Sequence, residues 1–145
     1  MEEKIEIYKH IYKDSDMSVS SLRKMKLDLK NKDNKIKDYL DYLIDEFNKY
    51  KNISKDELTE LNESLDEESF MAKLMSNIGI KKEVMNDNSD SHMAEVLIQG
   101  IVMGSINMEK TISKYSDKLD KADLSIAEEF LKFEQESIEK LKEYL

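Results

Sequence analysis

The 145-residue chain contains no proline and only three glycines, Gly79, Gly100 and Gly104. Sheet proteins of this size need many tight turns, and tight turns consume glycine and proline. A chain with so little of either residue must consist of long elements joined by few connections. Lys, Glu, Leu and Met are abundant, and all four are good helix formers. The sequence therefore predicts an all-α protein, and its length is that of a single domain spanning residues 1–145.

Charge and cysteine content exclude several classes of function. The formal net charge is −9 at pH 7, whereas nucleic-acid-binding proteins place a basic face against phosphate. The absence of cysteine excludes a disulfide framework, a thiolate nucleophile and a cysteine zinc site. The first residues, MEEKIEIYKHIYKD, are charged throughout and lack the apolar core of a signal peptide. We therefore expect a cytoplasmic protein that does not bind nucleic acid.

Apolar residues at helical spacing predict two long helices in the first half of the chain. The first runs from about Glu2 to Lys30, and NKDN at 31–34 predicts a turn after it. The second either continues to about Asn62 or is replaced by a new helix at Ser54, where SKDE has the form of a capping box. The stripe of the first helix comprises Ile5, Tyr8, Tyr12, Ser15, Val19, Leu22, Lys26 and Leu29, and that of the second comprises Ile36, Tyr39, Leu40, Leu43, Ile44, Phe47 and Tyr50.

Residues 66–88 are less regular. Gly79 followed by apolar Ile80 fits the end of a helix. We therefore expect a short extra helical segment between the second and third long helices, built on Phe70, Met71, Leu74 and Ile78. Residues 84–91 are rich in N-cap residues, so the third long helix should begin at Ser89 or Asp90.

The third long helix contains an almost uncharged stretch, HMAEVLIQGIVMGSINME, at 92–109. A membrane span needs about twenty predominantly apolar residues, and this stretch is shorter and includes Glu95. We therefore expect no membrane span. The helix should be a core helix ending near Tyr115 and surrounded by neighbours, with Gly100 and Gly104 on one face that another helix can approach closely.

A last turn at 116–123 should lead into a final helix from about Ala122 to Leu145. Glu134 falls on or beside the buried stripe of this helix, so it should point towards the core. The inward residues are predicted to be Ala127, Phe130, Ile138, Leu141 and Leu145. Four long helices in one domain indicate an antiparallel four-helix bundle.

Three segments also carry a resemblance that spans nearly the whole chain. The segments at 84–115 (VMNDNSDSHMAEVLIQGIVMGSINMEKTISKY), 130–145 (FLKFEQESIEKLKEYL) and 14–40 (DSDMSVSSLRKMKLDLKNKDNKIKDYL) resemble an uncharacterised bacterial family of ferritin-like four-helix proteins. The resemblance implies a ferritin-like bundle and brings no established activity with it.

The wider ferritin-like class suggests a di-iron site, which needs two Glu-x-x-His pairs and two further glutamates. His10 and His92 are the only histidines, His10 follows Ile7, and His92 precedes Glu95 in the reversed order. The full di-iron ligand set is therefore absent. A reduced site for iron, manganese or zinc would use His92, Glu95 and Glu134.

A structural interpretation of these residues competes with the metal site. Glu95 lies near a helix N-terminus, where the dipole favours an acid, and Glu134 could form an ion pair with Lys26 in or near the core. Lys26, Gln99, Asn107 and Glu134 could also converge on a buried polar site. Nine methionines would suit copper(I), but scattered positions such as Met71, Met75, Met93, Met103 and Met108 favour core filling.

Two functional hypotheses follow. The first is a non-enzymatic structural or protein-interaction module without a cofactor, whose partner is another protein or a second copy in a homodimer. The alternative is a small metal-binding or redox protein of ferritin-like ancestry that lacks the full di-iron ligand set. The sequence contains no G-x-S-x-G motif and no glycine-rich phosphate loop, so nothing in it predicts catalysis without a metal.

Overall fold

A computed structural model describes residues 2–65 and 87–145. These residues form four α-helices and one short 3-10 helix, with no strand among them: α1 (Glu2–Asp28), α2 (Lys37–Glu60), α4 (Asp90–Tyr115), α5 (Lys121–Leu141) and η2 (Lys142–Tyr144). The all-α prediction is confirmed. The short helical segment expected around Phe70 to Ile78 lies outside the described residues.

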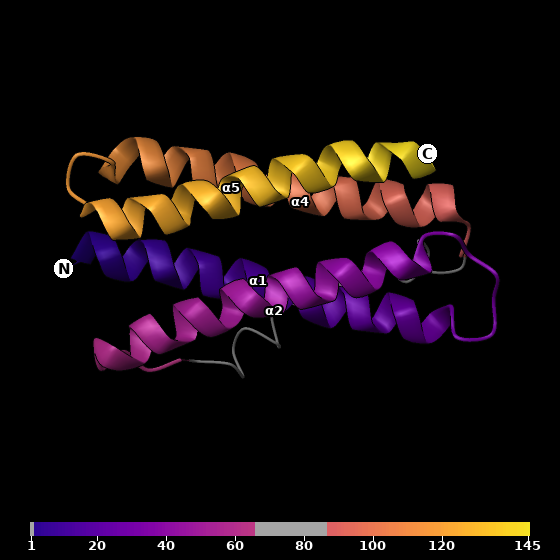
Figure 1. The fold of residues 1–145 in the computed structure, drawn as a ribbon, viewed down its shortest axis with the longest axis horizontal. Helices are drawn as coiled ribbons and strands as arrows, with labels where there is room; N and C mark the ends of the chain where they lie inside the picture. The colour runs from indigo at the N-terminus through magenta and orange to yellow at the C-terminus, as the bar shows by residue number, and fades with distance from the viewer. Residues whose placement is uncertain (1, 66–86) are drawn as a thin grey trace.

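The first two helices form an antiparallel hairpin (Figure 1). Ion pairs across it join early residues of α1 to late residues of α2, and late residues of α1 to early ones of α2. Most of these pairs are partly solvated, so each contributes little to stability. Together they show how the residues of α1 and α2 are aligned against one another. They are Lys4 with Glu57 (3.3 Å), Asp16 with Lys51 (2.9 Å), and Lys26 with Asp41. Lys9 also pairs with Glu63, which lies just beyond the end of α2 (3.1 Å).

The second hairpin, α4 and α5, packs against the first (Figure 1). The amide of Asn34, in the turn between α1 and α2, donates to Asp90 Oδ1 at 2.9 Å. At the same end of the bundle the rings of Tyr39 and Tyr144 stack, with their centroids 6.1 Å apart. The start of α4 therefore lies beside the start of α2, and these two helices run in the same direction. The link between them, residues 61–89, joins opposite ends of the bundle.

An aromatic cluster joins the two hairpins in the core. Phe47 and Tyr50 of α2 meet Phe130 and Phe133 of α5, and the Phe47–Phe133 and Tyr50–Phe130 ring centroids are 4.8 and 5.0 Å apart. Edge-to-face contacts of this kind add about 0.5–1.5 kcal/mol beyond the buried area. The cluster belongs to one continuous core that draws on α1, α2, α4 and α5.

Most helix boundaries agree with the sequence, apart from the alternative helix start at Ser54 and the end of the final helix. Ser89 is the N-cap of α4 and accepts from the His92 amide at 3.2 Å, as expected. Helix α2 continues through Ser54, whose hydroxyl donates to the Tyr50 carbonyl at 2.8 Å, so no new helix begins there. The capping-box pattern fails because Ser54 faces the core, where bonding within its own helix satisfies it.

Two predicted inward residues are in fact exposed. Leu145, the final residue, has 62% of its surface exposed because α5 ends at Leu141. Lys26 is also exposed. Within the described residues, no helix is long and apolar enough to cross a membrane.

Candidate functional site

Two carboxyl groups meet where α1, α4 and α5 come together. Glu134 of α5 has no exposed surface, and Asp14 of α1 is half-buried with its Oδ2 enclosed. A methyl group built on Gly104 of α4 would lie 2.6 Å from Asp14 Oδ2 and 2.8 Å from Glu134 Oε2. Three helices thus place two acids around one glycine. We call Asp14 and Glu134 the acid pair.

The acid pair must hold a proton. If both groups were ionised, Asp14 Oδ2 and both Glu134 oxygens would have no hydrogen-bond donor within the described residues. A protonated Glu134 resolves this, because its hydroxyl donates to the Asp14 carboxylate. Burial, the neighbouring charge of Asp14 and this hydrogen bond all raise the pKa of Glu134 well above its usual range. Burial also raises the pKa of Asp14, although the bond from Glu134 works against that increase.

His10 lies one turn before Asp14 on α1 and belongs to the same cluster. Burial lowers the pKa of His10, while the Asp14 carboxylate and a hydrogen bond with the Gly104 backbone act in the opposite direction. Its Nε2 is enclosed and has no hydrogen-bond partner among the described residues. Since the net effect favours the uncharged ring, His10 does not supply the positive charge that two ionised carboxylates would require.

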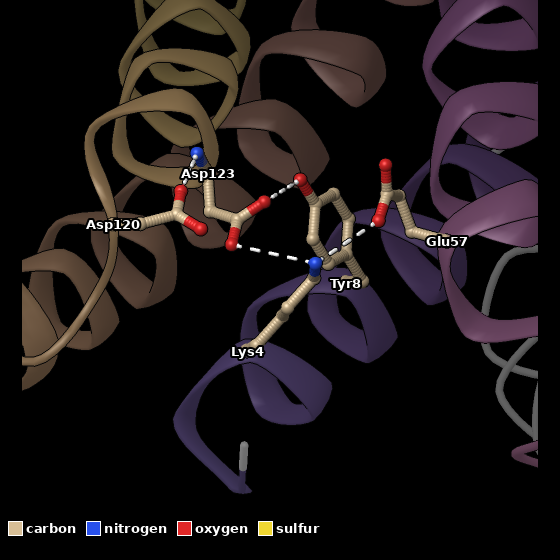
Figure 2. Close-up of polar contacts among 5 residues, drawn as sticks. All are labelled: Lys4, Tyr8, Glu57, Asp120 and Asp123. Atoms are coloured by element: carbon tan, nitrogen blue, oxygen red, sulfur yellow. Dashed lines mark hydrogen bonds and ion pairs between the residues drawn. The ribbon is translucent and has the colours of Figure 1, made fainter. Parts of the chain in front are cut away.

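A second polar cluster closes the end of the bundle where α1 begins (Figure 2). The hydroxyl of buried Tyr8 donates to Asp123 Oδ1 at 2.5 Å. Lys4 Nζ lies 3.7 Å from Asp123 Oδ2 and 3.3 Å from Glu57 Oε2. The Asp123 amide donates to Asp120, the N-cap of α5, at 2.9 Å. This cluster therefore connects α1, the end of α2 and the start of α5.

The geometry of this end cluster supports a structural role. Burial and the bond to Asp123 raise the pKa of Tyr8 well above its usual value, so Tyr8 stays protonated and acts as a donor. Asp123 lies in the first turn of α5, where the helix dipole favours a carboxylate. Because Lys4 already balances the negative charge of Asp123, this cluster needs no ligand.

The three metal-ligand candidates from the sequence occupy different environments. Glu134 is enclosed in the acid pair, whereas Glu95 is exposed on α4. His92 lies in the first turn of α4, with its Nδ1 4.0 Å from Asp87. It precedes Gly104, which touches the acid pair, by more than three helical turns. Within residues 2–65 and 87–145, no three His, Asp or Glu side chains are arranged to hold a metal ion.

Lys26, Gln99, Asn107 and Glu134 do not converge on a buried polar site. Lys26, Gln99 and Asn107 are all exposed, and Lys26 pairs with Asp41 of α2. Glu134 has Asp14 as its neighbour instead. Periodicity assigned Glu134 to the core correctly, but it could not identify which side chain of another helix would face it.

One face of α4 is exposed and uncharged over about two and a half turns. Met103 is 68% exposed and Ile106 is 45% exposed. Gln99, Gly100 and Asn107 lie on the same side and are also exposed. We call these five residues the α4 outer face. The expectation that neighbours surround α4 is therefore wrong for this side of the helix.

His10 and Asp14 were missed as site residues. Asp14 lies within DSD at 14–16, where only Ser15 was placed on the inward stripe of the first helix. A signal was present, because Ile7, Ile11 and Asp14 are three or four residues apart and therefore share a face.

No family model, curated protein or solved structure matches this chain.

The acid pair predicts a stability that falls as pH rises. Folding raises the pKa of Glu134, so the folded chain binds a proton that the unfolded chain has already released above the usual value of 4.5. Stability should therefore decrease with pH by up to about 1.4 kcal/mol per pH unit. Glu134→Gln keeps a donor to Asp14 and removes this proton. The variant should therefore flatten the slope of the free energy of unfolding against pH.

Urea denaturation between about pH 7 and pH 9 measures the slope, in a range where His10 is neutral both folded and unfolded. Glu136→Gln, an exposed acid on the same helix, is the matched control and should keep the parent slope. Equal slopes for the parent and Glu134→Gln would contradict the shared proton.

The two glycines of α4 should respond to alanine with opposite signs. A methyl group at Gly104 would collide with both carboxyl groups of the acid pair, so Gly104→Ala should destabilise the fold by about 1–3 kcal/mol. A methyl group at Gly100 meets no atom of residues 2–65 and 87–145 within 4 Å, so Gly100→Ala should stabilise the fold by up to about 1 kcal/mol. Urea denaturation of dilute protein compares the two, and stabilisation by Gly104→Ala would refute this account of the site.

Proposed function

We propose that this chain is a ferritin-like helical bundle that acts as a non-enzymatic protein-interaction module in the cytoplasm. The observation that carries this proposal is the α4 outer face. The chain is 38% charged, yet residues 96–108 contain no charged side chain, and the exposed residues Met103 and Ile106 lie within them. Contiguous exposed apolar surface on a soluble protein marks an interaction site.

The order of the helices supports the ferritin-like part of the proposal. Ferritin-like bundles contain one long crossover connection, in contrast to bundles whose links are all short. Here α2 and α4 run in the same direction, and residues 61–89 connect opposite ends of the bundle. The absence of cysteine is in keeping with a reducing, cytoplasmic setting.

The buried polar groups support a role other than catalysis. Glu134 has no exposed surface, so a substrate has no access to its carboxyl group. Tyr8 is similarly enclosed and is bonded to Asp123. These groups hold helices together, whereas the α4 outer face offers unused surface to a partner.

The test uses the full chain as bait in affinity capture, with Met103→Lys as the variant. A lysine on the α4 outer face should abolish binding of the protein partner, because the partner would have to bury an unpaired charge. Leu27→Lys is the matched control, since Leu27 of α1 is also 68% exposed and lies on a different helix. Equal capture by the parent and Met103→Lys would contradict a role for this face.

The second candidate is a small metal-binding or redox protein, and the unpartnered buried atoms of the acid pair and His10 are what favour it. No three described side chains are arranged to hold a metal ion, so this candidate requires the acid pair and His10 to move together when iron, manganese or zinc replaces the shared proton. Elemental analysis of untagged protein, purified without chelator, separates the two. We expect only trace metal in the parent and in Asp14→Asn/Glu134→Gln; near-stoichiometric metal lost in the variant would establish the second candidate.

A further inference from the structure

The α4 outer face fits a second copy of this chain. We propose that two copies associate through this face, with their α4 helices crossing antiparallel about a two-fold axis at Met103. This inference rests on the proposed interaction function and identifies the partner. Closed two-fold dimers use the same patch on both subunits, so the patch must complement itself.

Gly100 provides the first argument. A glycine inside a helix costs about 1 kcal/mol relative to alanine, and a close approach to the backbone would account for its presence. For Gly104 that approach is made by the acid pair inside the bundle. Gly100 is exposed, and a methyl group built on it meets no atom of the described residues within 4 Å, so that part of the chain gives no reason for the glycine. A helix of another molecule could approach the α4 backbone closely at Gly100, because none of the described side chains stands in its way there.

Net charge provides the second argument. Two copies that each carry a charge of −9 repel one another over most of their surfaces, so a contact between them has to use an uncharged face of each copy. A strongly charged partner would find its complement on the acidic surfaces rather than on the α4 outer face. An uncharged, partly apolar partner surface is required here, and the α4 outer face of a second copy has that composition.

The charges beside the face select an antiparallel arrangement. Glu95 and Lys110 are both exposed and lie at similar distances on either side of Met103. An antiparallel crossing at Met103 therefore brings Glu95 towards the partner's Lys110, and the two-fold axis repeats this pairing. A parallel crossing would place Glu95 beside the partner's Glu95, where like charges repel.

The size of the face sets the expected strength. A stable interface buries about 800 Å² on each partner, which is about 20–30 residues a side. About two and a half turns of one helix provide less than this, so the dimer should be reversible, with a dissociation constant in the micromolar range or weaker.

Sedimentation equilibrium of the full chain over a range of concentrations tests the proposal. The parent should show a monomer–dimer equilibrium, which Met103→Lys should abolish and Leu27→Lys should leave unchanged. Gly100→Ala should weaken the dimer by about tenfold while raising the urea midpoint of the dilute monomer. A merely structural role for Gly100 would not move these two quantities in opposite directions.

Charge reversal tests the orientation. Glu95→Lys and Lys110→Glu should each weaken the dimer several-fold, and the double variant should restore it, because the pairing is reversed rather than lost. A double variant no tighter than the single variants would overturn the antiparallel crossing.

The remaining outcomes separate the inference from the proposed function. A parent that stays monomeric at all concentrations, but whose α4 outer face captures a different protein, would overturn the inference and leave the proposed function standing. A monomer with no partner would overturn both. Crosslinks within one chain from residues 66–86 to the α4 outer face would also overturn the inference, because the chain itself would then cover this face.

Discussion

The acid pair imposes two conditions on the packing of α1, α4 and α5. First, an ionised carboxylate without a donor costs far too much in a buried site, so a proton must stay between Asp14 and Glu134. Second, the carboxyl groups need space that a side chain on α4 would fill, so Gly104 must lack a Cβ. If either condition failed, the acids would have to move apart, and the helices that carry them would lose their close approach.

The two polar clusters neutralise buried acids in different ways. At the end of the bundle, Asp123 accepts from Tyr8 and lies near Lys4, whose long side chain reaches in from partly solvated surface. No lysine makes such an ion pair with Glu134 among the described residues, so a proton replaces the cation. The end cluster therefore places a lysine beside its buried acid, whereas the acid pair couples folding to proton uptake.

Much of the fold could be predicted because burial of one helix face leaves a periodic trace in the sequence. Tyr8, Leu22, Phe130 and Glu134 all point inward, as that trace indicated. Contacts between helices leave no such trace, so the sequence offered Lys26 as one possible partner of Glu134, whereas the structure places Asp14 beside it. Leu145 was predicted to point inward for a similar reason, because the helical spacing of apolar residues continues in the sequence beyond Leu141, where α5 ends.

Helix α4 shows why hydropathy alone could not locate its neighbours. An uncharged face signals contact, but the contact can lie inside the chain or in another molecule. Gly100 and Gly104 are four residues apart and were expected to serve the same approach, yet in the part of the chain that the structure describes only Gly104 faces other side chains. Single exposed apolar residues such as Leu27 are normal on soluble proteins. Met103 and Ile106 differ because they lie beside Gly100 on one continuous uncharged surface, where a solvated helix of so charged a chain would carry Lys and Glu.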